Sequence, residues 1–258
     1  MLLAVDVGNT QTHFGTWDGE RLVEHWRFAT VRESTADELG AALRNLVELR
    51  GVGLADLDAS IVSSTVPQLA PEWAEMGRRY LNHETIVVGP GLKTGMPIRI
   101  DNPRELGADR IVNAVAAHTH LGGPCVAVDF GTAITYDVVS GAGEYLGGII
   151  TPGVEISLDA LSDRGAKLPK IDLAEPRSLI GKSTVDAIRS GIVFGFAGQV
   201  DGIIARLRAE LGEATRAIAT GGLARHVVPF TARGSIDEVD DLLTLKGLRL
   251  LHARSLQA

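Results

Sequence analysis

Residues 2–15 read LLAVDVGNTQTHFG, an apolar strand pattern that contains one acid, Asp6, and then reaches Gly-Asn-Thr. Burying a carboxylate at the end of such a strand costs several kcal/mol unless a partner offsets it. Residues 125–137, CVAVDFGTAITYD, repeat the pattern, because both stretches contain Ala-Val-Asp-x-Gly followed by a threonine. Two copies this far apart predict a duplicated domain rather than a solenoid of short repeats.

The elements expected after each copy are alike, which supports the duplication. In the first half, apolar runs and turn signals predict strands at residues 2–7, 12–17, 22–28, 59–66 and 85–88. Apolar spacing predicts helices from Ser34, as N-cap, to Gly51 and over 67–81 and 108–121. In the second half, strands are expected at 126–129, 135–139, 146–150 and 216–220, with helices after Pro152, over 183–211 and after 222. The fold class is therefore α/β, with mixed sheets flanked by helices and two domains, 1–122 and 123–258.

Composition excludes several classes of protein. The net charge is −7 and no basic stripe is visible, which argues against nucleic acid as a partner. A single cysteine, Cys125, cannot form a disulfide within the chain and indicates a reducing compartment. No apolar run reaches the ~20 residues of a membrane span, and the N-terminus does not read as a signal peptide. We expect a cytoplasmic protein that does not enter a membrane.

The first turn, Asp6-x-Gly8-Asn9-Thr10, has the chemistry of a phosphate site. Glycine permits close approach of the backbone, successive N–H groups form a concave anion site, and a carboxylate beside it can hold Mg²⁺. The alternative is an ordinary Asp-Gly turn. The second copy, Asp129-x-Gly131-Thr132, favours the phosphate site over the ordinary turn, because two acid-bearing hairpins can bind a nucleoside triphosphate.

Three further stretches have chemistry that is weaker when each is taken alone. Gly221-Gly222, at the end of an expected strand, can pack backbone against a flat ring such as adenine, and Gly147–Gly153 can form a pocket wall. In Gly-Ala-Asp-Arg, 107–110, Asp109 can accept a proton and Arg110 can hold a carboxylate. The structural alternatives are tight turns and a helix N-terminal acid. GKST at 181–184 is not a Walker motif, because residue 176 is proline.

Five motifs occur in order along almost the whole chain: DVGNT, NPRELGADR, DFGTAIT, GGIITPG and ATGG. In this order they resemble the type III pantothenate kinases, which belong to the actin-like, Hsp70-like and sugar-kinase-like ATPase superfamily. The resemblance implies two ribonuclease-H-like domains, a homodimer, and ATP-dependent phosphorylation of pantothenate to 4′-phosphopantothenate, the first step of coenzyme A biosynthesis. The glycines at 191, 195 and 198 of the long helix suit a close helix contact, either buried or in a dimer.

The resemblance also implies roles for individual residues. Asp109 is the general base, Asp6 lies near Mg²⁺, and Asp129 lies at the site of a monovalent cation, K⁺ or NH₄⁺. ATP binding is implied for Asp6, Val7, Gly8, Asn9, Thr10, Gln11, Thr12, His13, Thr132, Gly221 and Gly222. Pantothenate binding is implied for Gly107, Ala108, Asp109, Arg110, Thr184 and Ile100, although many relatives have an aromatic residue where this chain has Ile100. Another small-molecule kinase of the same fold and a non-catalytic regulator remain as alternatives.

Overall fold

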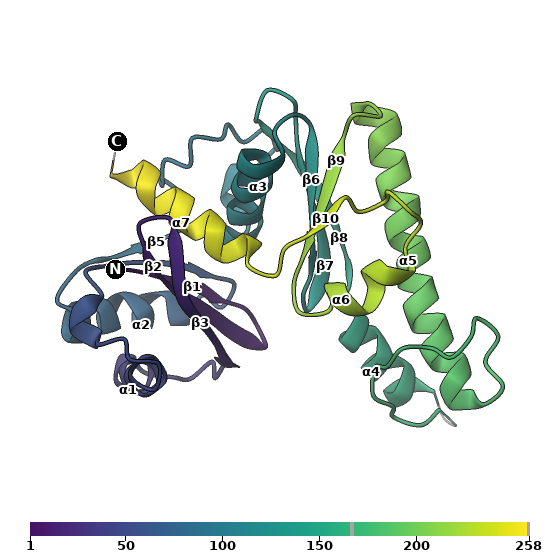
Figure 1. The fold of residues 1–258 in the computed structure, drawn as a ribbon, viewed down its shortest axis with the longest axis horizontal. Coiled ribbons are helices and arrows are strands. Elements are labelled where there is room, and N and C mark those ends of the chain that lie inside the picture. The colour runs from purple at the N-terminus through teal and green to yellow at the C-terminus, as the bar shows by residue number, and fades with distance from the viewer. Residues whose placement is uncertain (166–167, 257–258) are drawn as a thin grey trace. The chain divides into compact units, whose positions relative to one another are not determined.

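The computed structural model describes residues 1–165 and 168–256 and divides into two compact units (Figure 1). Unit 1 comprises residues 1–97, 101–116 and 243 onward, and unit 2 comprises residues 98–100 and 117–242. Each unit contains one five-stranded sheet with helices packed on it. The predicted α/β class and the predicted duplication are both confirmed.

The sheet of unit 1 has the strand order β3-β2-β1-β4-β5. Its strands are β1 (Leu2–Val7), β2 (Gln11–Asp18), β3 (Arg21–Ala29), β4 (Ala59–Ser64) and β5 (Thr85–Val87). The first three form an antiparallel meander, and β4 and β5 are added in parallel on the other side of β1. Because side chains alternate along a strand, Leu3, Val5 and Val7 face one core, while Asp6 lies on the opposite face.

Helix α1 (Ala36–Glu48) begins one residue later than the sequence predicts. Its N-cap is Thr35 rather than Ser34: the Thr35 hydroxyl accepts from the backbone of Glu38, and the Glu38 carboxylate accepts from the backbone N–H of Thr35. This reciprocal capping box satisfies two backbone donors that a helix start otherwise leaves open. Leu39 and Leu43 are buried along the helix and hold it on the sheet.

The helix expected over 67–81 consists of two parts. An α-helix, α2 (Leu69–Met76), continues into one π-helical turn over Gly77–Leu81, and Asn82 ends it in the left-handed conformation with φ 58°. Helix α3 (Ala108–Leu121) follows the long loop as predicted. Short 3₁₀ turns lie at Leu54–Asp56, Pro103–Glu105 and Val228–Phe230.

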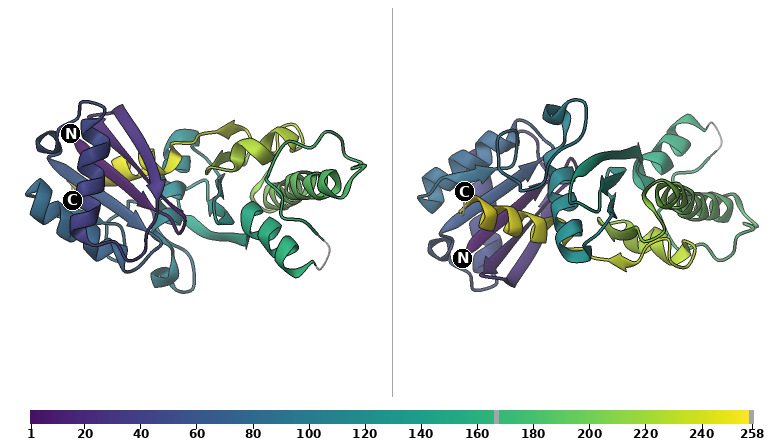
Figure 2. Two further views of the ribbon diagram at one scale, coloured as in Figure 1. Left: turned by 90° about the horizontal axis from the view of Figure 1, so that it is seen from below. Right: turned by 90° about the horizontal axis from the view of Figure 1, so that it is seen from above.

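Helix α7 (Leu243–Ser255) covers the second face of the sheet of unit 1, along β1 (Figure 2). Leu245 lies against the bare backbone of Gly15, and the Thr244 hydroxyl donates to Asn113 Oδ1 of α3 over 2.8 Å. Gly247 allows close contact with Val112, because a Cβ atom there would overlap the Val112 carbonyl. The expected division at residues 122 and 123 therefore differs from the structure, which puts the last helix in unit 1.

Unit 2 repeats the topology of unit 1. Its strands are β6 (Cys125–Phe130), β7 (Ala133–Val139), β8 (Tyr145–Pro152), β9 (Arg216–Thr220) and β10 (Glu238–Val239). Their order is β10-β9-β6-β7-β8. Read in reverse, β8-β7-β6-β9-β10 corresponds strand by strand to β3-β2-β1-β4-β5 of unit 1, with the same parallel and antiparallel neighbours. The helices of this unit are α4 (Val154–Arg164), α5 (Thr184–Leu211) and α6 (Ala224–Val227).

Helix α5 is the one helix of the described residues that is long and apolar enough to cross a membrane by length and composition alone. In the structure, apolar residues from Ile188 to Ile204 join the core against the sheet of unit 2. The apolar composition of α5 therefore also fits a helix that packs on a protein core. Gly191, Gly195 and Gly198 are exposed on the other side of this helix, and, apart from the helix's own backbone, no atom of the described residues lies within 4 Å of where their Cβ atoms would stand.

Candidate active site

Two acids occupy equivalent places in the two sheets. In unit 1, Asp6 of β1 lies opposite His13 of β2 and beside Ser63 of β4. In unit 2, Asp129 of β6 lies opposite Thr135 of β7 and beside Thr220 of β9. Residues paired across neighbouring strands share one face. Each acid is therefore flanked on both sides by polar side chains.

The first loop is a tight turn between β1 and β2. The N–H of Gly8 donates to the carbonyl of Gln11 over 3.0 Å, and a Cβ atom at Gly8 would stand 2.9 Å from that oxygen. Asn9 and Thr10 form the tip between them and are exposed. Val7 ends β1, and Gln11 and Thr12 begin β2. The backbone of the loop is thus free to approach a ligand closely, as a phosphate site requires.

The second loop is narrower and is held by glycines on two sides. The N–H of Gly131 donates to Ala133 O over 3.1 Å, and the N–H of Gly153 donates to Thr132 O over 3.1 Å. Gly221, after β9, has φ 92°, and a Cβ atom there would overlap Asp129 Oδ1 and stand 2.6 Å from the Phe130 nitrogen. Gly221 therefore packs directly behind the carboxylate of Asp129.

Asp109 lies in the first turn of α3, inside unit 1. Burial raises the pKa of its carboxyl group above the ordinary value, although backbone donors and the Arg110 guanidinium oppose that shift. Gly107 leaves room for it, because a Cβ atom at that position would stand 2.7 Å from Asp109 Oδ1. Ala108 is the first residue of α3, so the Gly-Ala-Asp-Arg motif lies at the N-terminal end of this helix. A raised carboxyl pKa suits a general base, because it brings the group closer to the working pH.

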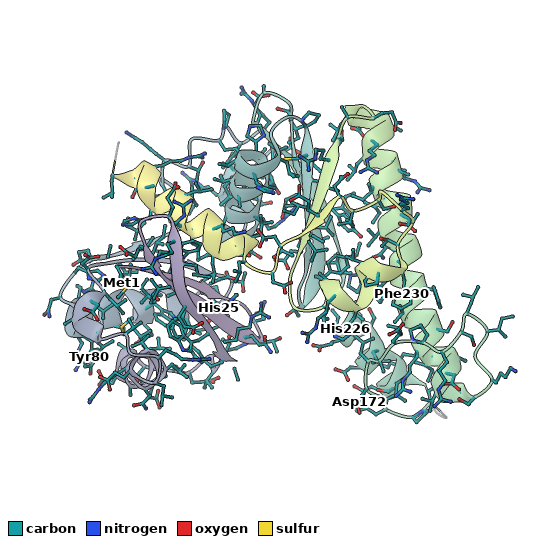
Figure 3. The ribbon with its side chains drawn as sticks, viewed as in Figure 1. Met1, His25, Tyr80, Asp172, His226 and Phe230 are labelled. Atoms are coloured by element: carbon teal, nitrogen blue, oxygen red, sulfur yellow. The ribbon has the colours of Figure 1, made fainter. Side chains whose placement is uncertain are left out.

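His13 is uncharged at neutral pH. Burial, together with the charge of Arg27 and the neighbouring His25, lowers the pKa of His13 to about 3. Its Nε2 atom lies 3.1 Å from Nδ1 of His25, which is labelled on the first sheet in Figure 3. His13 can therefore donate or accept one hydrogen bond beside Asp6, but it cannot neutralise a phosphate.

Ile100 and Thr184 lie in unit 2. Ile100 Cγ2 stands 3.6 Å from where a Cβ atom of Gly147 would be, so the structure brings Ile100 onto the predicted glycine-rich wall. Thr184 is exposed at the first residue of α5, after the N-cap Ser183. Gly222 follows Gly221 at the end of β9.

Sequence reasoning missed two side chains that lie at the first loop. Arg32 Nη2 donates to Asn9 Oδ1 over 3.4 Å, and it brings a positive charge to the tip of the loop. Thr30 donates its N–H to Thr10 O over 2.9 Å and shares a 2.9 Å hydroxyl contact with Thr12. The register could have indicated Thr30, because the residue before it, Ala29, pairs with Gln11 at the start of β2.

The donors at both acids fit the cations that the resemblance implies. Across residues 1–165 and 168–256, no cluster of three or more His, Cys, Asp or Glu side chains could cage a metal ion. Mg²⁺ needs no such cage, because it is commonly held by one or two carboxylates together with substrate phosphates. Asp6 fits that role beside the phosphate loop. Asp129 stands between the threonines of β7 and β9, an oxygen-rich setting of the kind that a monovalent cation takes.

Comparison with protein families identifies one family model over most of the chain. The model of type III pantothenate kinase matches residues 2–206. A type III pantothenate kinase of Moorella thermoacetica is 51% identical over 255 residues, which cover 99% of this chain and 100% of that one. A type III pantothenate kinase of Streptomyces griseus is 52% identical over 263 residues, covering 99% of this chain and 98% of that one.

Solved structures share the fold at low sequence identity. A candidate Baf family transcriptional activator from Campylobacter jejuni superposes with a TM-score of 0.58 at 20% identity, over 99% of this chain and 100% of that one. A ROK hexokinase from Thermus thermophilus gives a TM-score of 0.50 at 16% identity, over 100% of this chain and 99% of that one. These likenesses support the duplicated, actin-like architecture and nothing about substrate.

Proposed function

The chain belongs to the type III pantothenate kinase family, and from this membership we propose how its residues phosphorylate pantothenate. The activity is phosphoryl transfer to pantothenate in coenzyme A biosynthesis. ATP is the donor and 4′-phosphopantothenate is the product. The observation that carries the assignment of the chemistry is the half-buried Asp109, whose carboxyl pKa is raised by burial, at the start of α3 within the Gly-Ala-Asp-Arg motif.

Asp109 acts as the general base. The primary hydroxyl of pantothenate attacks the γ-phosphorus while Asp109 takes its proton, and ADP leaves with the electrons of the broken bond. Burial supports this role, because a pKa above the ordinary carboxyl value brings the base closer to the pH at which the enzyme works. Arg110 can hold the carboxylate of pantothenate through a charge-assisted hydrogen bond, and Ile100 and Thr184 contact the rest of the substrate.

Each loop offers its own groups to the nucleotide. Backbone N–H groups around Gly8 and the tip residue Asn9 contact the phosphates, with Thr132 on the second loop and Gly221 at the adenine end. Mg²⁺ on Asp6 and a monovalent cation on Asp129 would neutralise charge on the polyphosphate, which is the main requirement of phosphoryl transfer. His13 is neutral, so the positive charge near the first loop comes from Arg32, which contacts Asn9, and from Arg27, which is paired with His13 across the sheet.

The enzyme is a homodimer built on α5. Thr184, Ala187, Gly191, Gly195 and Gly198 are exposed and recur every three or four residues, so they form one stripe along the helix. Small residues permit close approach of a second helix. Leu179 and Ile180, just before α5, are 66% and 78% exposed and supply apolar surface for such a contact. We place the enzyme in the cytoplasm, in keeping with its single, buried cysteine.

Two alternatives are tested by the same assay. Another kinase of this fold would phosphorylate a different small alcohol, and a regulator would phosphorylate none. The purified protein is incubated with ATP, Mg²⁺ and K⁺ and with a panel of alcohols that includes pantothenate, sugars and amino sugars. Formation of 4′-phosphopantothenate in preference to other products is the expected result. Turnover of a sugar alone, or of nothing, would overturn the proposal.

A further inference from the structure

Residues 98–100 run along the edge of β8, inside unit 2, where Ile98 forms an isolated β-bridge. Ile98 pairs in parallel with Tyr145, and the N–H of Arg99 donates to the Tyr145 carbonyl over 2.8 Å. The next residue, Ile100, then lies against Gly147. The place of Ile100 is therefore set by the main chain of Tyr145.

Tyr145 is in turn held by a buried acid. Its ring is fully buried, and its hydroxyl donates to Asp137 Oδ1 over 2.9 Å. Asp137 is also fully buried, and its other oxygen accepts from the Thr135 hydroxyl over 3.3 Å. A buried polar pair of this kind contributes little more stability than apolar side chains of the same volume. It does fix the position and the rotamer of the residues that it joins.

We propose that Tyr145 is a positioning residue for the pantothenate pocket: anchored by Asp137, it holds the segment that carries Ile100 at the pocket wall. The proposal rests on the proposed function, because it assumes that Ile100 contacts pantothenate. Tyr145 touches neither substrate nor nucleotide in this scheme and acts only through the segment 98–100.

The side chain of Arg99 adds little to this anchor. Its guanidinium lies 2.7 Å from Glu144 Oε1, but the Arg99 side chain is 61% exposed. Exposed ion pairs contribute between nothing and about 1 kcal/mol. The hydrogen bond between the main chains of Arg99 and Tyr145 is therefore the contact that positions Ile100.

The first test removes one oxygen atom from each of two neighbouring tyrosines. Tyr145→Phe deletes the hydroxyl that bonds Asp137. Tyr136→Phe is the matched control. Tyr136 is as buried as Tyr145, but it lies on the face of β7 opposite to Asp137, and its hydroxyl has no hydrogen-bond partner among the described residues. Steady-state kinetics should show KM for pantothenate raised roughly tenfold in Tyr145→Phe, the factor that corresponds to about 1.4 kcal/mol. KM for ATP should stay unchanged, and Tyr136→Phe should match wild type.

The second test leaves the core untouched. Arg99→Pro removes the N–H that bonds Tyr145, because proline has no such donor, whereas Arg99→Ala removes only the ion pair. We expect KM for pantothenate to rise in Arg99→Pro and to stay within about twofold of wild type in Arg99→Ala, the range of a surface ion pair. This pair keeps the proposal testable if Tyr145→Phe is unstable.

The outcomes separate this proposal from the proposed function. A wild-type enzyme that does not phosphorylate pantothenate refutes the function. An active wild type whose KM for pantothenate is the same in Arg99→Pro and Arg99→Ala refutes the positioning role alone. A rise in KM for ATP equal to the rise for pantothenate also refutes it, because a general loss of structure would affect both substrates.

Discussion

We expect the substitution Gly221→Ala to lower both thermal stability and affinity for ATP, because the backbone of Gly221 packs directly behind the carboxylate of Asp129. Gly221→Ala forces two changes at once. The residue must hold φ 92°, which L-residues avoid, and its new Cβ atom must share space with Asp129 Oδ1 and the backbone of Phe130. Gly212→Ala is the matched control: Gly212 has φ 107°, but, apart from its two chain neighbours, no atom of residues 1–165 and 168–256 lies within 4 Å of its Cβ position. The difference between the two variants therefore isolates the overlap with Asp129.

The magnitudes follow from these two contributions. A positive φ costs about 1–2 kcal/mol for an L-residue, so Gly212→Ala should lower the Tm by ~2–8 °C for a chain of this size. Overpacking of a filled site adds about 1–3 kcal/mol, so Gly221→Ala should lower the Tm by ~4–20 °C. The overlap can be relieved most easily by displacing the carboxylate of Asp129, and this displacement should weaken ATP binding.

The assay combines thermal unfolding with titration calorimetry of ATP at fixed Mg²⁺ and K⁺. Gly212→Ala should lose stability and keep its affinity for ATP. Gly221→Ala should lose more stability and also bind ATP more weakly. Equal losses of stability in the two variants, with equal affinity for ATP, would refute the close packing of Gly221 on Asp129 and its part in the nucleotide site.

Three further predictions concern the base, the cation and the assembly. Asp109→Asn should lower kcat roughly 10²-fold or more. Because burial raises the pKa of Asp109, its ionised form opposes folding above that pKa, so the variant should have a higher Tm than wild type at neutral pH and should lose this advantage as the pH falls toward 3.8. A near-normal kcat, or a Tm difference that does not change with pH, would contradict this. Replacing K⁺ by Na⁺ at equal ionic strength should reduce activity sharply. Asp129→Ala should remove the activity, and calorimetry should show that K⁺ no longer affects ATP binding in this variant. Equal activity in the two salts would argue against a K⁺ site. Gly195→Leu should shift sedimentation toward a monomer, whereas Ala142→Leu, which adds the same side chain to an exposed turn, should not; a monomeric wild type would exclude the dimer.

The features that the sequence could predict are those encoded within a few neighbouring residues. The turns at Gly8 and Gly131 were predictable because each follows a short apolar strand that ends in an acid. The duplication was predictable because the same local pattern occurs twice. The start of α1 was misplaced by one residue, since Ser34 and Thr35 are both good caps. The Glu38 side chain decides between them, because it completes a capping box only with Thr35.

The features that the sequence did not reveal depend on residues far apart in the chain. The bond between Tyr145 and Asp137 depends on both side chains projecting from the same face of neighbouring strands; Tyr145 belongs to no recognisable motif, and Asp137 only ends the second repeat. The contact of Ile100 with Gly147 depends on a loop that returns to the edge of β8. Arg32 reaches Asn9 from beyond a whole hairpin. Register and side-chain length fix these contacts, and a single sequence does not show them.

The place of α7 has a consequence for how the chain is made. Unit 1 contains β1 and also α7, which follows all of unit 2 in the chain. At synthesis rates of about 5–20 residues per second, the face of β1 that carries Asp6 is exposed for roughly 6–25 s after α3 has been made, until its covering helix follows. During that interval unit 2 can complete its own core first. The N-terminal half of this enzyme should therefore be the last to reach its native state, and a chaperone that protects apolar sheet surface would act on it.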